Sequence, residues 1–408
     1  MNDWVECVLG DICSFAKERI DVNLLSEKNY ISTENMLPDK NGIVEATSLP
    51  SVNSVSKYQK DDVLVSNIRP YFKKIWFASM QGGCSNDVLV FRSKLNCNSE
   101  FLYYILSDNI FFDYVTKTSK GTKMPRGDKN AIMGYNILLP PLQTQKKIAS
   151  ILSSLDDKIE INTRMNKVLE EIARALFHRW FVEFEFPDAE GRPYKSSGGK
   201  MVESEMGLVP EGWVVGTLGD IAEIIDCLHS KKPERCDVGK PLLQLNNIQN
   251  DGLLDMSEIY FISEEDYSKW ISRCEASKGD CVITNVGRVG AVAQIPEGVY
   301  AALGRNMTCV RCKGDYYFPT FLIEYLLSDP MRSEILKKTD TGTILDALNV
   351  KNIPKLMIVI PDNQTLKAFE RILRPLRYKM EMNLKENHSL TFSRDTILPK
   401  LLRGDLVS

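Results

Sequence analysis

The chain runs through one arrangement of sequence twice, and this internal repeat constrains its fold more than any other feature. The stretch "LLPPLQTQKKIASIL" at 138–152 closes an apolar run, breaks it with proline and opens a long periodic segment. The stretch "VIPDNQTLKAFERIL" does the same at 359–373, an offset of 221 residues. Earlier matches pair "WVECVLGDI" with "WVVGTLGDI" and "KDDVLVSNIR" with "KGDCVITNVG". The pattern predicts two copies of one large unit rather than a solenoid of short repeats.

Each copy is predicted to open with a mixed α+β domain of about 140 residues, an ordinary domain size. Short apolar runs between Gly, Asn, Asp and Ser clusters predict strands. One helix is predicted near Phe101–Val115 and again near Phe321–Lys338. A stretch rich in Gly, Ser, Pro and charge between the copies has linker composition. The predicted boundaries are 1–140 and 213–361 for the domains, 141–183 and 362–402 for the helices, 184–212 for the linker, and 403–408 for a tail.

Apolar residues step by four and three over more than four heptads after each proline break. This spacing is the seam of a coiled coil. The seam positions are Ile148, Leu152, Leu155, Ile159, Asn162, Asn166, Leu169, Ala173, Leu176 and Trp180 in the first helix, and Phe369, Leu373, Leu376, Met380, Asn383, Asn387, Leu390, Arg394, Ile397 and Leu401 in the second.

Two asparagines lie on each seam, Asn162 and Asn166 in the first helix and Asn383 and Asn387 in the second. A seam Asn fixes register, because out of register it is buried without a partner. Both pairs lie near mid-helix, so they suit parallel and antiparallel pairing alike, although one helix after each domain favours the antiparallel arrangement. The alternative is that each helix packs only on its own domain. About 38 residues at 1.5 Å each is nearly 60 Å, too long for most single domains.

Composition narrows the function classes. The chain has 408 residues, enough for two or three domains, and a net charge of −3, so an anionic partner must be held by local basic patches. No apolar run approaches the 18 or so residues that span a bilayer, and the first residues do not resemble a secretory signal. The ten cysteines are scattered through apolar patterns and predict buried thiols in a reducing cytosol. We therefore expect a cytoplasmic protein that does not associate with membranes.

The sequence offers no constellation for catalysis. It has no GxxxxGK[ST], GxGxxG or HExxH motif. Of the three histidines, His178 and His388 lie on the predicted helices and suit surface positions. Cys309 and Cys312 form a lone CxxC in a strand-like run, so no metal site is expected. Asp61-Asp62, matched by Gly279-Asp280, suits a turn before a strand. We expect a chain without enzymatic activity, cofactor or metal of its own.

With these features the chain resembles the specificity subunit of type I restriction–modification enzymes. The resemblance covers nearly the whole chain and includes the two-copy layout, "LPPLQTQKKIASILSSLDDKIEIN", "YISTENM" and the closing "LPKLLRGDL". The second helix start, "IPDNQTLKAFERIL", departs from the pattern because it lacks the second proline and the "QKKI" stretch. The most specific part of the resemblance lies at the first helix start, at Pro140, Gln143, Ile148, Leu152, Leu155 and Ile159.

The resemblance implies an α+β fold in which two similar globular target-recognition domains are separated by two long antiparallel coiled-coil helices, as a pseudo-twofold repeat. It implies that each domain reads half of a split site in double-stranded DNA. The helices would set the gap and dock two modification (methyltransferase) subunits, which use S-adenosylmethionine, and restriction subunits would complete the nuclease. The degenerate second helix start implies that one docking surface is weaker than the other.

DNA contacts usually come from basic and polar side chains on loops of a rigid domain. The foremost candidate is the loop "KTSKGTKMPRGDKN" at 117–130, although it could instead be a solvated turn. The candidates in this loop are Lys120, Thr122, Lys123 and Arg126, with Thr118 and Ser119 as further hydrogen-bonding groups. The remaining candidates are Lys337, Lys338, Thr341 and Thr343 in the matching loop, Asn67, Arg69, Asn285 and Arg288 after matching strands, and Gln244, Asn246, Asn247, Arg305 and Asn306, any of which could equally be turn formers.

Two other function classes stay open. Twin domains on a coiled coil could instead bridge protein partners as a scaffold without DNA. Basic faces on both domains would favour DNA, and scattered charge would favour the scaffold. An enzyme with an unfamiliar motif is the third class, and the absence of a shared acid, base or nucleophile in the two copies argues against it.

Overall fold

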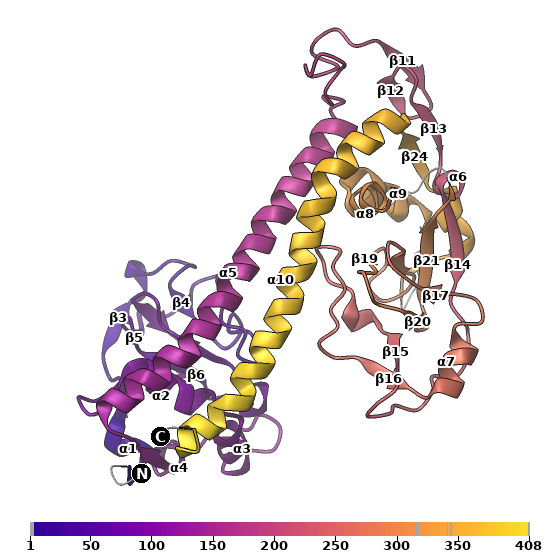
Figure 1. Ribbon diagram of the computed structural model, residues 1–408. Helices are drawn as coiled ribbons and strands as arrows, with labels where there is room; N and C mark the ends of the chain where they lie inside the picture. Colours follow the sequence, from indigo (N-terminus) through magenta and orange to yellow (C-terminus); the bar gives the residue numbers. More distant parts are fainter. Residues whose placement is uncertain (1–3, 315–317, 341, 343–344, 407–408) are drawn as a thin grey trace. The chain divides into compact units, whose positions relative to one another are not determined.

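The computed structural model describes residues 4–314, 318–340, 342 and 345–406 (Figure 1). The chain divides into a first unit, Met1–Ile159 with Ser389–Ser408, and a second unit, Glu160–His388. The long helices α5 (Leu142–Phe181) and α10 (Asn363–Arg403) each contribute to both units. Their ends agree with the predicted helices at 141–183 and 362–402 to within two residues.

The first unit builds its globular part from two four-stranded sheets and a two-stranded ribbon. One sheet has the order β2 (Cys13–Phe15), β9 (Val88–Ser93), β6 (Val63–Ser66), β7 (Ile75–Phe77), and the other β3 (Arg19–Asp21), β5 (Ser54–Tyr58), β8 (Gly82–Cys84), β4 (Tyr30–Ile31). The ribbon is β1 (Val5–Val8) with β10 (Asn136–Leu139). The helices are α1 (Leu9–Ile12), α2 (Ser99–Ser107), α3 (Asn109–Lys117) and α4 (Lys129–Met133), with 3₁₀ turns η1 (Val22–Leu24) and η2 (Pro70–Phe72).

The second unit repeats this plan. Its sheets have the orders β14 (Ala222–Asp226), β21 (Met307–Cys312), β18 (Cys281–Thr284), β19 (Val292–Gln294), and β16 (Tyr260–Ile262), β15 (Lys240–Leu243), β20 (Ala301–Leu303), β17 (Glu275–Ala276). The ribbon is β13 (Val214–Thr217) with β24 (Met357–Ile360). Two short pairs are β11 (Met201–Ser204) with β12 (Gly207–Pro210) and β22 (Thr339–Asp340) with β23 (Ala347–Leu348). The helices are α6 (Leu218–Ile221), α7 (Glu264–Trp270), α8 (Pro319–Leu327) and α9 (Asp329–Lys338), with 3₁₀ turns η3 (Leu245–Asn247) and η5 (Val350–Lys355).

The two units correspond strand by strand, which confirms the predicted repeat. The antiparallel sheet β2-β9-β6-β7 has its counterpart in β14-β21-β18-β19. In the second sheet, the parallel pair β4–β8 matches β15–β20, and the antiparallel pair β5–β8 matches β17–β20. The sheets differ at both edges. In the first unit β3 pairs with β5, whereas in the second unit β16 pairs with β15, the counterpart of β4, at the opposite end of the sheet.

The prediction of a single helix in each domain is wrong, because the structure has two consecutive helices in each of these segments. In the first unit Asp108 has an extended backbone (ψ 138°), ends α2 and caps α3 by accepting a hydrogen bond from the Ile110 amide at 3.1 Å. Ser328 takes the same role between α8 and α9. A side chain that caps a new helix competes with continuation of the old one.

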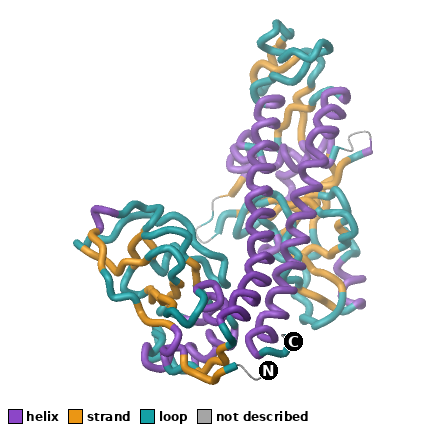
Figure 2. The backbone as a smooth tube through the Cα atoms, turned by 60° about the vertical axis from the view of Figure 1, so that its left-hand side comes forward, coloured by secondary structure: helices purple, strands orange, loops and turns teal. Residues whose placement is uncertain are grey.

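The long helices lie side by side and run antiparallel, as Figure 1 and Figure 2 show. In the first unit Arg394 of α10 donates to Asp156 of α5 at 2.7 Å. In the second unit Phe369, near the start of α10, packs against Phe181, near the end of α5, with ring centroids 4.7 Å apart. All predicted seam positions are buried or half-buried. The parallel alternative and packing on a single domain alone are both wrong.

The four seam asparagines bond across the pair. Asn162 donates to the side-chain oxygen of Asn387 at 2.9 Å, and Asn383 donates to that of Asn166 at 2.8 Å. Asn166 also donates to the backbone carbonyl of Met380 at 3.0 Å. Asn162 and Asn383 are fully buried. The earlier asparagine of α5 faces the later one of α10, and the later faces the earlier, so the two pairings match only in this antiparallel register.

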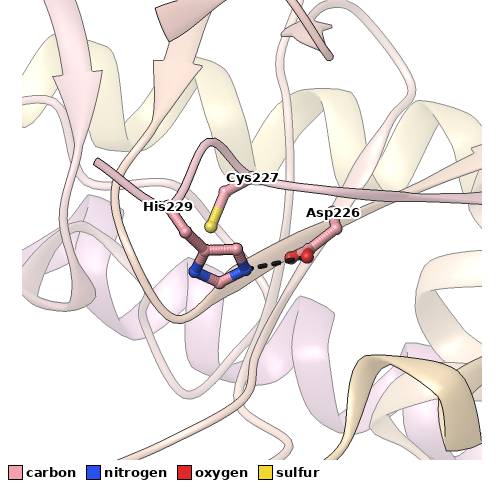
Figure 3. A group of neighbouring side chains, drawn as sticks. All are labelled: Asp226, Cys227 and His229. Carbon is pink, nitrogen blue, oxygen red and sulfur yellow. Dashed lines mark hydrogen bonds and ion pairs between the residues drawn. The ribbon is translucent and has the colours of Figure 1, made fainter.

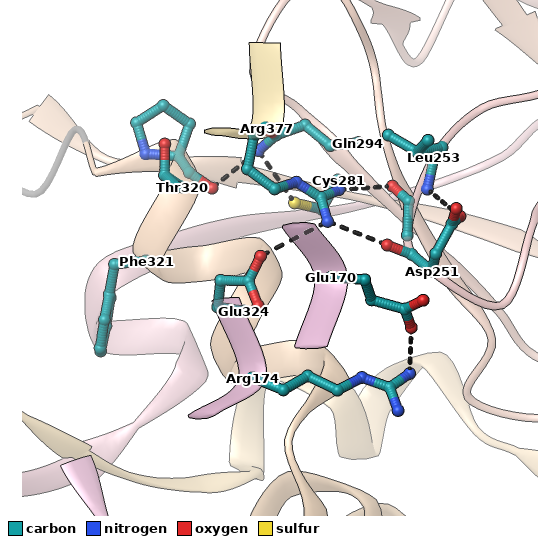
Figure 4. A network of polar contacts seen from close by, with 12 residues as sticks. Glu170, Arg174, Asp251, Leu253, Cys281, Gln294, Thr320, Phe321, Glu324 and Arg377 are labelled. Carbon is teal, nitrogen blue, oxygen red and sulfur yellow. Dashed lines mark hydrogen bonds and ion pairs between the residues drawn. The ribbon is translucent and has the colours of Figure 1, made fainter. Parts of the chain in front are cut away.

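A buried arginine joins α10 to the globular part of the second unit (Figure 4). The Arg377 guanidinium donates to the backbone carbonyls of Asp251 and Gly252, both at 2.9 Å, and lies 3.4 Å from the Glu324 carboxylate. Burial raises the pKa of Glu324, and the nearby Arg377 charge opposes this shift. In the first unit the corresponding position of α5 is Asp156, which accepts from the Tyr104 hydroxyl at 2.7 Å. Each long helix is thus tied to a domain by a polar side chain.

The segment predicted as a linker, 184–212, is folded and belongs to the second unit. It contains the β11–β12 hairpin, and Phe186 stacks between Tyr194 and Trp213 with ring centroids 4.6 and 4.8 Å away. Trp213 also donates its indole N–H to Asp362 at 3.1 Å. Gly, Ser and Pro supply the turns of this segment, while the aromatic residues within it supply packing that composition alone conceals.

Candidate nucleic-acid interface

Two loops of the first unit meet beside the end of β6. The turn after β6 and the loop 117–130 share backbone hydrogen bonds, from the Arg69 amide to the Pro125 carbonyl at 2.8 Å and from the Gly127 amide to the Asn67 carbonyl at 3.1 Å. An isolated bridge pairs Ile68 with Arg126. The structure therefore brings together two candidates that lie about 50 residues apart in the sequence.

The 117–130 loop is an ordered hairpin-like turn. Lys120 and Arg126 exchange two backbone hydrogen bonds of 2.9 Å. The Lys120 ammonium pairs with Asp128, and the Arg126 guanidinium lies 3.1 Å from Asp87. The hydrogen bond from Lys120 holds the pKa of the Asp128 carboxyl below its usual value, and backbone amides at the start of α4 add to this effect. At the tip, Lys123 is exposed and forms no ion pair among the described residues.

The hydroxyl candidates of this loop divide into two groups. Thr118 and Ser119 donate to backbone carbonyls of α3, at 2.9 Å to Tyr114 and 2.7 Å to Thr116, and so help to end that helix. Thr122 is exposed at the tip. Only Thr122 of these three presents its hydroxyl to solvent without a described protein partner.

Asn67 and its counterpart Asn285 are buried, with exposed fractions of 8% and 6%. Asn285 donates to the Leu348 carbonyl at 3.2 Å and accepts from the Thr308 hydroxyl at 2.9 Å. The Asn67 side-chain oxygen is buried without a partner among the described residues. A Cβ added at Gly127 would lie only 2.7 Å from that oxygen, so the loop closes tightly over Asn67. Asn285 fixes its loop through a side-chain hydrogen bond, whereas Asn67 does so through its backbone carbonyl, which accepts from the Gly127 amide.

The turn that follows Asn67 has two residues in the left-handed region. Arg69 (φ 49°) and Lys73 (φ 50°) flank η2, and such a conformation costs a non-glycine residue about 1–2 kcal/mol. Between them Tyr71 and Phe72 are 47% and 40% exposed, with ring centroids 4.7 Å apart. Sequence reasoning named Arg69 here and missed the aromatic pair, which "RPYFKK" signals as aromatics inside a basic, proline-led turn.

The second unit makes the corresponding junction with different side chains. The Leu348 amide donates to the Asn285 carbonyl at 2.9 Å, and a bridge pairs Val286 with Ala347. Arg288 donates to the Ile248 carbonyl at 2.6 Å, which holds its guanidinium against the protein. Lys337 lies 3.5 Å from Glu334. Lys338 is half-buried, and the predicted contacts Thr341 and Thr343 lie outside the described residues.

The remaining candidates occupy separate turns of the second unit. Arg305 and Asn306 are exposed between β20 and β21, and Asn306 is left-handed (φ 68°). Asn246 is exposed in η3. Gln244 is half-buried and donates to the Leu243 carbonyl at 2.9 Å. Asn247 is buried and donates to the carbonyls of Asp255 and Glu258, so its role is structural.

The paired aspartates have a role beyond the predicted turn. Asp62 and Asp280 each accept a backbone amide hydrogen bond within their turn, as expected. Each also receives two hydrogen bonds from an arginine on the neighbouring strand of the sheet, Arg92 of β9 in the first unit and Arg311 of β21 in the second. Each aspartate is buried and paired with an arginine of its own unit, so it stabilises the sheet of that unit rather than performing chemistry.

One group of side chains among the described residues could share a metal ion, Asp226, Cys227 and His229 (Figure 3). His229 is bonded to Asp226 at 2.8 Å, and Arg273 places a positive charge 3.5 Å from the same carboxylate. Burial raises the pKa of the Cys227 thiol, which opposes the thiolate that a metal needs. The group has three ligands and a neighbouring cation, and it does not suit a zinc site.

Cysteines and histidines elsewhere have structural settings. All ten cysteines are free thiols. Cys309 and Cys312 stand three apart on β21, so their side chains point to opposite faces of the sheet and cannot hold one ion. His388 is 3.2 Å from Asp255 and only 31% exposed in its side chain, whereas His178 lies 3.5 Å from Glu183 at the surface. Within the described residues, every helix is too short or too polar to cross a membrane.

Comparison with known proteins matches both copies. A family model described as "Type I restriction modification DNA specificity domain" matches residues 1–171 and again 210–391, so each match contains one globular domain and most of the helix that follows. The type I restriction enzyme HindI specificity subunit of Haemophilus influenzae is 25% identical over 467 residues and covers 100% of both chains. The MjaIX specificity subunit of Methanocaldococcus jannaschii is 27% identical over 316 residues, 76% of this chain and 69% of that relative. In fold, the chain resembles the crystal structure of a type I restriction–modification S subunit from M. genitalium, with a TM-score of 0.62, 16% identity, and 98% and 96% of the two chains covered.

Proposed function

We propose a mode of action for this chain from the premise that it belongs to the family of type I restriction–modification DNA specificity proteins. In this proposal it is the DNA specificity subunit of such a system, and each globular domain reads one half of a bipartite site in double-stranded DNA. The antiparallel helices set the gap between the half-sites. The observation that carries the proposal is the repeat itself, in which two domains of one plan are each followed by one of two paired helices.

The basic loops support DNA as the ligand. In the first unit the paired loops present Arg69, Lys123, Lys120 and Arg126 at one junction, although the last two share their charge with carboxylates. Cations on loops of a rigid domain suit phosphate contacts, and exposed polar and aromatic groups suit base edges. The buried Asn67 fixes the backbone of this surface rather than touching DNA.

The long helices carry a surface suited to a protein partner. In the second unit α5 exposes four apolar side chains at steps of four, three and four, namely Ile161, Met165, Val168 and Ile172, with exposed fractions of 55%, 37%, 53% and 46%. Apolar residues at this spacing form one face of a helix, and such a stripe fits the groove of a partner helix. We assign this face to a modification subunit, and a full complex would add restriction subunits.

Chemistry belongs to the partners in this proposal. The exposed groups at the junction of the two loops in the first unit are cations, hydroxyls and aromatic rings, which suit binding and orienting DNA. Methyl transfer from S-adenosylmethionine would take place in the modification subunit. This chain would contribute position, by holding its two half-sites at a fixed separation.

Methyl transfer by the purified chain, alone and with its modification subunit, tests the proposal. The chain with S-adenosylmethionine and mixed-sequence DNA should transfer no methyl group. The assembled complex should methylate DNA at one bipartite motif. Sustained transfer by the chain free of a copurifying partner would contradict the non-catalytic role, and a complex that methylates without sequence preference would contradict the specificity role.

A further inference from the structure

We propose that the turn Arg69–Lys73 of the first unit is a base-reading element, in which Tyr71 and Phe72 contact base edges of double-stranded DNA and Arg69 contacts the adjoining backbone. The proposal rests on the proposed DNA-specificity function and deepens it, by assigning a reading element to one of the two domains. Three independent features of the turn carry it: its backbone conformation, its exposed aromatic pair and the charge around it.

The backbone of the turn is strained where the other copy is not. The second unit has glycines at the matching positions, Gly287 (φ 85°) and Gly290 (φ 75°), which enter the left-handed region without steric cost. The first unit uses Arg69 and Lys73 at φ values of 49° and 50°. The matching turn of the second unit, which is one residue shorter, uses glycine at both points, so the left-handed backbone does not by itself require the side chains of Arg69 and Lys73. Strain of this kind concentrates at functional sites.

The aromatic pair at the top of this turn is exposed and rigidly held. Tyr71 and Phe72 leave nearly half of their surface in solvent, so they contribute little to the core. The turn is fastened on the protein side by hydrogen bonds from the Asp39 amide to the Phe72 carbonyl at 2.9 Å and from the Lys40 amide to the Lys73 carbonyl at 3.0 Å. A preorganised aromatic contact loses little conformational freedom on binding.

The charge around the pair suits a polyanion. Lys73 and Lys74 bond neutral groups, the Asn109 side chain at 2.9 Å and the Thr33 carbonyl at 2.6 Å, and form no ion pair among the described residues. Arg69 forms no ion pair among the described residues, and its amide joins the turn to the loop that carries Lys123. Apolar surface inside a cationic rim fits a DNA groove, where aromatic carbon can contact the thymine methyl group while cations meet phosphates.

The second unit lacks this element. Its turn offers no aromatic residue between Gly287 and Gly290, and Arg288 is held against the Ile248 carbonyl. The two domains therefore read their half-sites through different side chains, presented on turns that follow the matching strands β6 and β18. Loss of the aromatic pair should relax recognition of one half-site and leave the other intact.

The experiment compares variants of the chain in complex with its modification subunit. Methylome sequencing of a host that carries the wild-type genes defines the motif, and binding is then measured on duplexes with that motif or with single changes in either half. The double variant Tyr71→Ala/Phe72→Ala should lose about tenfold or more of its discrimination in one half-site, the range of one good base contact, with the other half-site unchanged. Leu95→Ala, a fully exposed apolar residue of the same unit, is the matched control and should bind as wild type.

Arg69→Gly separates function from folding. The change relieves the left-handed strain, so the Tm of the first unit should rise by about 2–4 °C, as expected for a domain of this size, while affinity for the motif duplex falls severalfold. Variants that keep wild-type affinity and discrimination would overturn the proposal, as would an equal loss on matched and mismatched duplexes. A wild-type complex without any motif would instead overturn the proposed function itself.

Discussion

Replacement of two seam asparagines tests how the helices choose their register. Asn383 is fully buried, and its amide N–H group donates to the Asn166 side-chain oxygen at 2.8 Å, while its own oxygen has no partner among the described residues. Asn166→Leu therefore leaves the whole Asn383 amide buried and unpaired. A buried polar group without a partner costs about 1–3 kcal/mol.

The double variant Asn166→Leu/Asn383→Leu should recover this loss. It removes both amides together and places apolar side chains on the seam, which stabilises helix pairing at the expense of register. We expect the double variant to be at least as stable as wild type, with a coupling free energy of about 2 kcal/mol between the two sites. Coupling of this size is typical of side chains in direct contact.

Urea unfolding of the four proteins in the cycle, followed by circular dichroism at the helical band, measures this coupling. An exposed pair on the same helix serves as the control: Glu160 and Arg164 form an ion pair with side chains 58% and 77% exposed, and should couple by about 0.3–0.5 kcal/mol. If the Asn166 and Asn383 changes are additive within about 0.5 kcal/mol, the hydrogen bond does not govern the pairing and the reasoning fails.

Two further predictions concern the recognition loop and pH. Simultaneous change of the loop cations Lys120, Lys123 and Arg126 to alanine should weaken DNA binding across sequences. The slope of log K against log[salt] should become shallower by the equivalent of one to three phosphate contacts, at about 0.9 per contact. An unchanged slope in a salt titration would show that the loop is only a solvated turn. The hydrogen bond from His388 lowers the pKa of Asp255, so the ionised carboxylate stabilises the fold above the usual titration range of an Asp and this contribution fades as pH falls below about 4. Asp255→Asn should accordingly lower the urea midpoint at pH 6 and lower it less at pH 3, and an equal loss at both values would contradict the assigned role of the charge.

Periodic features could be predicted from the sequence because they depend on local spacing. The two long helices, their ends and their seam follow from apolar steps of three and four, and the four seam asparagines follow from the same count. The repeat gave the two-unit plan, since matching segments fold alike. The antiparallel direction needed more than the asparagines, because mid-helix pairs suit both directions.

Features that depend on contacts between distant residues could not be predicted. Asn67 looked like a contact residue after a strand, yet Gly127, 60 residues away, closes over it. The 184–212 segment has linker composition, but Trp213 and Phe186 pack it into a folded unit. The left-handed backbone at Arg69 has no local signature, because the glycine that would reveal it is present only in the other copy.

The central claim is that the helix pair sets the gap between two half-sites. One heptad can be duplicated in each helix, with residues 153–159 inserted after Ile159 and residues 389–395 inserted before Ser389. This lengthens both helices by about 10 Å and rotates the helix face beyond each insertion by only about 20°. At 3.4 Å per base pair this is about three base pairs. A seven-residue insertion after the exposed Gly198, where no atom crowds the chain, is the control.

Methylome sequencing of hosts that carry the wild-type, lengthened or control gene with the modification subunit is the most direct test. The wild-type chain and the control insertion should give one bipartite motif with a single gap. The lengthened chain should give the same two half-sites with a gap wider by about three base pairs, as calculated from the helix rise. An undivided wild-type motif, or altered half-sites with an unchanged gap in the lengthened chain, would contradict the account.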